Sequence, residues 1–179
     1  RAKYCDDLKV TAMAHAVPVY SDEVNAEIVS IEIAAAKSSP GVLCVLTAKD
    51  VPGSATHGQI IKDYPMLVRD RIRCNSDVIA IVVAETRSQA IVASRLVKCV
   101  ARPLPAVFDP EEALRSPKVL VHEHHQFEGK HCNITNHHKI RRGNARQAFL
   151  ECDFVLDQKF ETQFIEHAYL EPESGLCIP

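Results

Sequence analysis

The stretch Val78–Ala84 (VIAIVVA) constrains the fold of this chain more than any other part of the sequence. All of its residues are apolar and most are β-branched, a composition that favours a strand buried on both faces. The next stretch, Thr86–Val97 (TRSQAIVASRLV), combines a threonine start signal with apolar positions at helical spacing, which predicts an amphipathic helix. We therefore expect the strand in the middle of a sheet, within a fold of the α+β class.

Shorter elements are expected on either side of this pair. Before it, the pattern predicts two strands, a helical turn and a buried strand, over Met13–Tyr20, Ala26–Ile33, Ala34–Ser38 and Val42–Leu46. Residues 47–65 should form an irregular excursion, because prolines, glycines and polar residues interrupt any apolar pattern. After the helix, residues 96–101 should turn into a strand that Pro103 and Pro105 end, and Pro110–Leu114 should form a short helix.

A stretch rich in histidine and asparagine, from residue 116 to residue 142, indicates a linker between two structural units. Beyond it, Gly143–Leu150 reads as a short helix with an asparagine cap, and Phe154–Thr162 (FVLDQKFET) alternates as a strand does. We expect a first domain over 1–101, a linker over 102–142 and the beginning of a second domain over 143–179. The chain starts without a methionine and stops inside an apolar segment that reads as an unfinished strand, so both ends are expected to be cut.

Composition argues against several classes of function. The chain has 21 basic and 23 acidic residues and a net charge of −2, so no overall field attracts nucleic acid or anionic lipid. The sequence contains no signal peptide and no run of about eighteen apolar residues, and a membrane role is not expected. Seven separated cysteines without a CxxC pair favour a reducing, cytoplasmic compartment over a disulfide scaffold. Cys44, Cys99 and Cys177 lie among apolar residues and are expected to be buried thiols.

The histidine-rich stretch also offers ligand atoms for a metal. The candidate ligands are His122, His124, His125, His131, Cys132, His137 and His138. Structural zinc sites hold their ligands as spaced pairs on a turn or helix, and adjacent histidines in a polar run lack that frame. We therefore expect a solvated linker without a metal. The metal-binding alternative predicts zinc or nickel that is lost when His124 and His131 are replaced.

One late segment, Glu166–Glu173 (EHAYLEPE), places ionisable residues within an otherwise apolar stretch. Burial of such groups without hydrogen bonds would cost about 1–3 kcal/mol each. These side chains should therefore pair internally, face a cofactor or contact another domain, and structural pairing is the preferred interpretation. No GxGxxG, Walker, HExxH or GxSxG motif is present, so no motif indicates a nucleotide site or a common hydrolase.

Five pieces of the sequence follow the order and spacing of one enzyme family. They are AHAVPVYSDEVNAEIVSIE, PGVLCVLTAKDVPG, VIAIVVAETRSQA, LPAVFDPEEAL and a tail that runs from RGN through CDFVLDQKFET to EHAYLEPE. Together they resemble the large subunit of the molybdenum hydroxylases, the xanthine dehydrogenase and aldehyde oxidase family. The resemblance covers nearly the whole chain. It implies an α/β hammerhead domain of mixed sheet and short helices, a linker, and the beginning of a molybdopterin-binding domain.

The resemblance implies an oxidoreductase that hydroxylates a purine, an N-heterocycle or an aldehyde with water as the oxygen source. Molybdenum bound to molybdopterin would carry the reaction, and 2Fe-2S clusters and FAD on other domains or subunits would take the electrons. The implied partners are the remainder of the molybdenum-binding subunit, the FAD and iron-sulfur parts, and a small-molecule substrate. The chain itself is expected to be a scaffold without catalytic residues and to be inactive alone. The alternative is a stand-alone binding or assembly module with the same fold.

Two positions are implied to lie near the molybdenum. Family members often carry a glutamine just before the EH pair, where this chain has Ile165, so Ile165 and Glu166 are the candidate cofactor-binding residues. A second departure is Asn75–Asp77, which stands where a glycine usually precedes the central strand, although asparagine tolerates a left-handed turn. A scaffold that packs on other domains should also expose an apolar surface and tend to self-associate.

Overall fold

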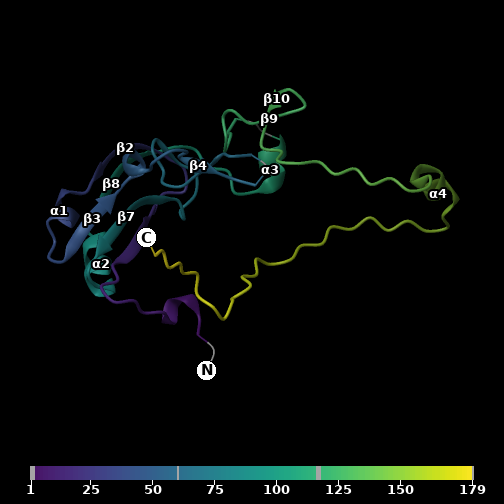
Figure 1. Ribbon diagram of the computed structural model, residues 1–179. Helices are drawn as coiled ribbons and strands as arrows, with labels where there is room; N and C mark the ends of the chain where they lie inside the picture. Colours follow the sequence, from purple (N-terminus) through teal and green to yellow (C-terminus); the bar gives the residue numbers. More distant parts are fainter. Residues whose placement is uncertain (1–2, 60, 116–117, 179) are drawn as a thin grey trace. The chain divides into compact units, whose positions relative to one another are not determined.

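The computed structural model describes residues 3–59, 61–115 and 118–178 (Figure 1). The chain divides into two compact units, one formed by Val10–Ile134 and the other by Arg1–Lys9 together with Thr135–Pro179. We call them the main unit and the terminal unit. Residue 60, inside the expected excursion, residues 116 and 117, inside the expected linker, and residue 179, at the end of the last expected strand, lie outside the described residues.

The strand Val78–Ala84 (β7) lies at the centre of a three-stranded sheet. It pairs in antiparallel direction with β1 (His15–Tyr20) on one side and with β3 (Val42–Leu46) on the other. Both of its faces are covered, since alternate residues of a strand point to opposite sides and buried residues occur on each side of β7. The prediction of a central strand buried on both faces is therefore confirmed.

Two short helices cover one face of this sheet. Ala80 and Val82 of β7 form a core with Val45 of β3 and with one alanine from each helix, Ala36 of α1 (Ala34–Lys37) and Ala93 of α2 (Arg87–Ser94). The small alanine side chains let both helices approach the sheet closely. Thr86 caps α2 by accepting a hydrogen bond from the Gln89 backbone N–H at 3.3 Å, as the start signal predicts.

The turn from α1 into β3 requires a glycine at position 41. Gly41 has a φ of +76°, a conformation that side chains with a Cβ rarely adopt. A Cβ there would also lie 2.2 Å from Nε2 of Gln89, which fills the space beside the turn. The glycine therefore ends the helical turn and lets the first residues of α2 pack beside the start of β3.

The other face of β7 packs on a second three-stranded sheet. Its strand order is β6 (Arg71–Ile72), β2 (Ala26–Glu32) and β8 (Lys98–Pro103), with antiparallel pairing throughout. Ile79 of β7 forms this second core with Ala26, Val68 and Ile72. The helices thus pack on one face of β7 and the second sheet packs on the other, which is the α+β class expected from the sequence. Every strand pairing among the described residues is antiparallel. The combination of strands and short helices agrees with the architecture that the resemblance implies.

Over its described residues, 47–59 and 61–65, the excursion contains only short regular pieces, as expected. The 3-10 helix η2 (Ala48–Asp50) begins after Thr47, whose backbone N–H donates to Oδ2 of Asp50 at 2.8 Å. This hydrogen bond, and a second one from the Thr47 hydroxyl, lower the pKa of Asp50 because they favour the charged carboxylate. Two short strands, β4 (Thr56–His57) and β5 (Tyr64–Pro65), then pair in antiparallel direction.

The part of the chain between β8 and residue 134 also folds in the main unit. The predicted short helix is present as α3 (Pro110–Arg115). The histidine-rich stretch forms a small hairpin of β9 (Gln126–Phe127) and β10 (Lys130–His131), with positive φ at the turn residues Glu128 and Gly129. Residues 118–134, which the sequence places in a linker, thus belong to the main unit.

The terminal unit holds η1 (Cys5–Asp7), α4 (Ala145–Glu151) and chain without regular structure. The Asn144 side chain accepts a hydrogen bond from the Gln147 backbone N–H at 3.2 Å, which confirms the predicted cap of α4. The strand predicted over Phe154–Thr162 is wrong for this structure, which describes no strand between residues 152 and 178. A strand needs a neighbour for its backbone hydrogen bonds, and an alternating sequence cannot supply one.

The cysteines differ from the expectation of buried thiols. Cys44 and Cys177 are exposed and Cys99 is half-buried, and the described residues contain no disulfide. Cys44 lies on β3 at a position whose side chain points away from the core, so apolar neighbours in sequence did not imply burial. Burial raises the pKa of the Cys99 thiol, and the charge of Glu23 raises it further.

Candidate functional site

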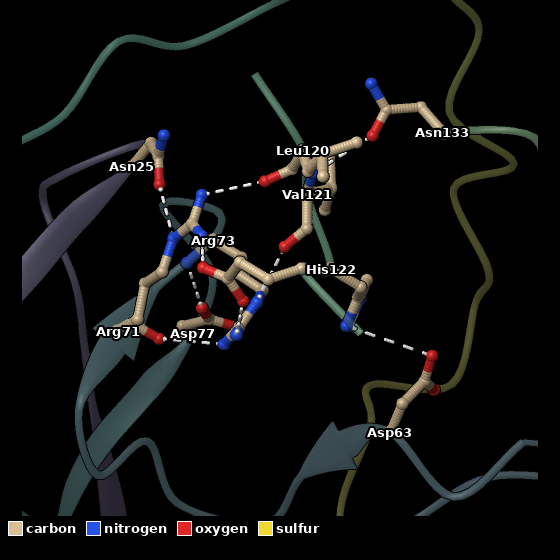
Figure 2. Close-up of polar contacts among 10 residues, drawn as sticks. Asn25, Asp63, Arg71, Arg73, Asp77, Leu120, Val121, His122 and Asn133 are labelled. Atoms are coloured by element: carbon tan, nitrogen blue, oxygen red, sulfur yellow. Dashed lines mark hydrogen bonds and ion pairs between the residues drawn. The ribbon is translucent and has the colours of Figure 1, made fainter. Parts of the chain in front are cut away.

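Two arginines at the end of β6 hold the stretch 119–134 against the second sheet (Figure 2). Arg71 lies in β6 and Arg73 follows two residues later, so both guanidinium groups emerge on the same side of the chain. Both bind one carboxylate, that of Glu123 in the histidine-rich stretch. We call Arg71, Arg73 and Glu123 the arginine clamp.

Arg71 is the more buried arginine of the clamp. Only 16% of its side chain is exposed, and it makes an ion pair with Glu123. Its Nε donates to Oδ1 of Asn25 at 3.1 Å and its Nη2 donates to the Leu120 carbonyl at 2.9 Å. Burial, followed by the nearby charge of Arg73, lowers the pKa of Arg71, but an arginine remains charged at any physiological pH. The group therefore needs all of these acceptors.

Arg73 extends the same contact by one residue along the stretch. Its Nε donates to the Val121 carbonyl at 2.8 Å, and its Nη2 lies 3.3 Å from Oε2 of Glu123. The turn that carries Arg73 is fixed by Asp77, which is buried and accepts hydrogen bonds from the backbone N–H groups of Arg73 at 2.7 Å and Cys74 at 3.3 Å. Asn75 does not have a positive φ, so the Asp77 carboxylate organises this turn without a left-handed residue.

The Asn133 side chain, near the end of the stretch, binds backbone groups near its beginning. Its Oδ1 accepts from the Val121 backbone N–H at 3.0 Å, and its Nδ2 donates to the carbonyls of Val119 at 2.8 Å and Ala113 at 3.3 Å. The ring of His125 donates to the Ile134 carbonyl at 2.6 Å when its proton is on Nε2. Side chains thus satisfy backbone groups that a short irregular segment cannot satisfy alone, and this explains why the stretch folds in the main unit.

A cavity of about 820 Å³ lies between this stretch and the loop that precedes β6. Apolar residues form part of its wall, among them Ala48, Pro65, Leu67 and Val68. Its charged residues are the three clamp residues with Lys62, Asp63, Arg69 and Asp70. Because cations and carboxylates nearly balance, the cavity has no strong electrostatic preference for an anion or a cation.

His122 is the titratable group whose protonation bears on this region. Burial lowers its pKa from the ordinary value of 6.5, Asp63 opposes this, and Arg73, His125 and Arg71 add to it. Nδ1 of His122 lies 3.9 Å from Oδ2 of Asp63, but the lowered pKa leaves the ring mainly neutral at neutral pH (Figure 2). The pair is therefore a contact between a neutral ring and a carboxylate at pH 7.

The lowered pKa predicts that the main unit loses stability as the solution becomes acidic. Below pH 6.5 the unfolded chain binds a proton at His122 more readily than the folded chain, so the free energy of unfolding falls with pH until the folded ring is also protonated. Urea unfolding at pH 7.5 and pH 5.5 should show a smaller pH effect in His122→Gln than in the unmodified protein. His124→Gln is the matched control and should keep the full effect; an unchanged pH effect in His122→Gln would contradict the prediction.

The residues implied to lie near molybdenum are in the terminal unit. Ile165 and Glu166 are both exposed, and Glu166 accepts a hydrogen bond from the His167 backbone N–H at 2.9 Å. The side chains of the EHAYLEPE segment are exposed and not buried, yet some of them pair within the chain: His167 stacks on Tyr169 with centroids 5.7 Å apart, and Oε1 of Glu171 accepts a hydrogen bond from the Cys5 backbone N–H at 3.4 Å. Ile165 has no polar side-chain atom, so its own side chain cannot bind a metal.

The described residues contain no group of three histidine, cysteine or carboxylate side chains placed to hold a metal. The histidines are instead dispersed, since His125 binds a carbonyl, His131 contacts Gln126 and His138 contacts Asn136. In the same part of the chain, no helix is long and apolar enough to cross a membrane.

Sequence reasoning missed the arginine clamp. Arg71 and Arg73 alternate around a buried isoleucine, a pattern that places two cations on one side of a strand. Glu123 stands among histidines about fifty positions later, and nothing local connects it with the arginines. The alternation could have suggested that the arginines act together, but their common partner required the fold.

Comparison with known proteins decides the family. The aldehyde oxidase and xanthine dehydrogenase a/b hammerhead domain matches residues 1–105. The chain belongs to this family. This hammerhead chain is 34% identical over 177 residues to a probable xanthine dehydrogenase subunit of Bacillus subtilis (strain 168), which covers 99% of the chain and 23% of that protein.

The similarity extends beyond the hammerhead. The nicotinate dehydrogenase large molybdopterin subunit of Eubacterium barkeri is 30% identical over 178 residues, covering 98% of the chain and 40% of that subunit. Among solved structures, the reconstituted CO dehydrogenase from Oligotropha carboxidovorans has a TM-score of 0.60 and 33% identity, covering 63% of the chain and 14% of that structure's chain. The hammerhead chain thus spans less than half of the length of these relatives.

Proposed function

We propose that this chain is the hammerhead-bearing part of the large, molybdopterin-binding subunit of a hydroxylase that oxidises a purine, an N-heterocycle or an aldehyde. The observation that supports it is the similarity to a xanthine dehydrogenase subunit and to a large molybdopterin subunit over nearly the entire chain. Both relatives are named as dehydrogenases, which supports an oxidoreductase as the parent. We place that parent in the cytoplasm, on the basis of the unpaired cysteines.

The proposed contribution of the chain is structural. Residues 1–101 would form the hammerhead, residues 102–142 would connect it onward, and residues 143–179 would begin the molybdopterin-binding domain. The arginine clamp would fix the connecting stretch on the second sheet, so that the chain leaves the hammerhead from a defined position. This role needs rigid contacts and no reactive group, in agreement with a scaffold that is inactive alone.

The cofactors belong to the parent enzyme in this proposal. Molybdenum with molybdopterin, when bound, would supply the two-electron oxidation that converts a C–H bond into C–OH with oxygen from water. The 2Fe-2S clusters and FAD, on other domains or subunits, would receive these electrons. The residues of this chain do not fit a cofactor cradle alone, and no catalytic step is assigned to them. We propose that Ile165 and Glu166 contact the molybdenum region only when the remainder of the subunit is present, Ile165 as an apolar wall.

Metal and pterin analysis tests the proposal. The protein encoded by the complete native locus and this 179-residue chain would be purified side by side without oxygen. We expect about one molybdenum and one pterin per complete subunit and none in the chain, since relatives extend far beyond the matched part. Xanthine, nicotinate and an aldehyde, each assayed in ¹⁸O-labelled water, would then identify the substrate class by label in the product. If neither protein holds molybdenum, the chain is a stand-alone binding or assembly module.

A further inference from the structure

The two arginines of the clamp together hold one carboxylate. Nη1 of Arg71 is paired with Oε1 of Glu123, and Nη2 of Arg73 lies 3.3 Å from Oε2 of the same group. Each arginine thus binds one oxygen, an arrangement that uses the planar donor groups of both side chains. All three side chains also line the cavity of about 820 Å³, so the carboxylate is bound at the wall of a space that is large enough for a small molecule.

Other contacts fix both guanidinium groups independently of Glu123. Nε of Arg71 donates to the Asn25 side chain, and Nε of Arg73 donates to the Val121 carbonyl (Figure 2). Nη1 of Arg73 also lies 3.3 Å from the carbonyl oxygen of Arg71. These partners remain when the carboxylate leaves, so Nη1 of Arg71 and Nη2 of Arg73 still converge on the place that it occupied. Binding of another carboxylate there would therefore require little ordering of the protein.

Glu123 is the member of the clamp that can be displaced. Its side chain is 45% exposed, whereas those of Arg71 and Arg73 are 16% and 26% exposed. Rotation of the side chain alone would move its carboxylate into solvent, without any change in the backbone of the stretch 119–134. Solvent screens the ion pairs of such a group, and holding a glutamate in one rotamer costs conformational entropy. An external carboxylate would thus compete with an internal one that is weakly held.

The rest of the cavity wall indicates what kind of carboxylate fits. Without the Glu123 carboxylate, the charged groups among the described residues of the wall are four cations and two carboxylates: Lys62, Arg69, Arg71, Arg73, Asp63 and Asp70. An excess of cations favours an anion. Apolar side chains line the same cavity, among them Pro65 and Ile61, which is 51% exposed. Such a wall can cover the apolar body of a ligand while the arginines bind its charged group.

We infer that this cavity binds a small aromatic carboxylate, whose charged group replaces that of Glu123 between Arg71 and Arg73 and whose ring lies against the apolar wall. Glu123 is then an internal competitor that occupies the arginines until the ligand arrives. An inorganic anion such as phosphate would use the arginines alone and leave the apolar wall uncovered, so it fits the cavity less well. The inference goes beyond the proposed function and does not depend on it, because every group involved lies in the main unit.

Equilibrium dialysis of radiolabelled benzoate against the 179-residue chain, at pH 7.5 in a phosphate-free buffer of low salt, tests the inference. The unmodified chain should bind benzoate with a Kd on the order of 1 mM, because a tethered carboxylate competes at a similar effective concentration. Glu123→Ala should bind at least about fivefold more tightly, since the competitor is gone. Glu128→Ala is the matched control, because it removes the same charge from an exposed position of the same stretch that does not line the cavity. Equal affinities of Glu123→Ala and Glu128→Ala would overturn the inference.

Two further probes of Glu123→Ala separate the roles of charge and ring. Benzamide keeps the ring without the charge, and acetate keeps the charge without the ring; each should bind at least about tenfold more weakly than benzoate. Binding of benzamide as tight as that of benzoate would show that the arginines are not used. Binding of acetate or phosphate as tight as that of benzoate would show that the apolar wall is not used. Either result overturns the proposed ligand class.

Arg73→Met, added to Glu123→Ala, tests the arginine directly. It should weaken benzoate binding at least about tenfold, because one of the two charged donors is lost. Arg102→Met in the same background is the matched control, since Arg102 is exposed and does not line the cavity, and it should keep the affinity. Circular dichroism checks that the variants fold. Retained benzoate affinity in a folded Arg73→Met variant would contradict the inference, and the comparison of benzoate with benzamide decides it even if that variant does not fold.

Discussion

Ile72→Ala is expected to lower the free energy of unfolding of the main unit by about 2–5 kcal/mol. Ile72 is fully buried and is among the largest side chains with no exposed surface. It forms a core with Ala26, Val68 and Ile79 at the point where the second sheet packs on β7. Ala26 in β2 and Ile79 in β7 are held in sheets and cannot move in to fill the space. The substitution therefore adds the cost of a cavity to the lost apolar contact.

Urea unfolding followed by far-ultraviolet circular dichroism measures this effect, since the chain contains no tryptophan. Ile72→Val should cost about 0.5–1.5 kcal/mol, because it removes a single methylene group. Val29→Ala, at a position of β2 that is 68% exposed, should change stability by about 0.5 kcal/mol or less. Equal effects of Ile72→Ala and Val29→Ala would show that the second core does not stabilise the main unit.

Arg71→Met is expected to destabilise the main unit by about 2–3 kcal/mol and to loosen the stretch 119–134. Methionine keeps much of the side-chain volume but removes the donors to Asn25 and Leu120 and the ion pair with Glu123. The Leu120 carbonyl then loses its partner, and one charge of the clamp is lost. Trypsin should cleave the stretch at Lys118 or Lys130 several-fold faster than in the unmodified protein, in proportion to the increased opening.

A double-mutant cycle with Glu123→Gln isolates the ion pair within this effect. Because 45% of the Glu123 side chain is exposed, solvent screens the pair, and we expect a coupling energy of about 1 kcal/mol with the rest of the loss due to hydrogen bonds. The control is Arg102→Met with Glu27→Gln, an ion pair in which both side chains are at least half exposed and whose coupling should be smaller. Equal coupling energies for the two pairs would mean that the clamp is an ordinary surface ion pair.

Local sequence was sufficient where one element makes its own contacts. The run Val78–Ala84 could only be stable as a strand covered on both sides, and it is the strand shared by both cores. Thr86 and Asn144 each cap the helix that follows them, because a cap is a hydrogen bond between residues three positions apart. The same sequence, read against its relatives, was sufficient for the family.

Contacts between distant residues were beyond prediction. The histidine-rich stretch has the composition of a solvated linker, yet part of it folds in the main unit because Arg71 and Arg73 bind its carbonyls from about fifty residues away. Cys44 lies among apolar residues, but the face of β3 on which it stands is decided by the pairing with β7. In both places the outcome depends on which residues meet in space.

The sequence by itself determined the α+β class, the central strand, the helix caps and the family, since these follow from periodicity, local hydrogen bonding and the order of motifs. The tertiary structure decided the arginine clamp, the lowered pKa of His122 and the absence of a strand over Phe154–Thr162. The physical reason is the same in each case. Ion pairs, burial and strand ladders each need a second group, and only the folded chain determines whether that group is there.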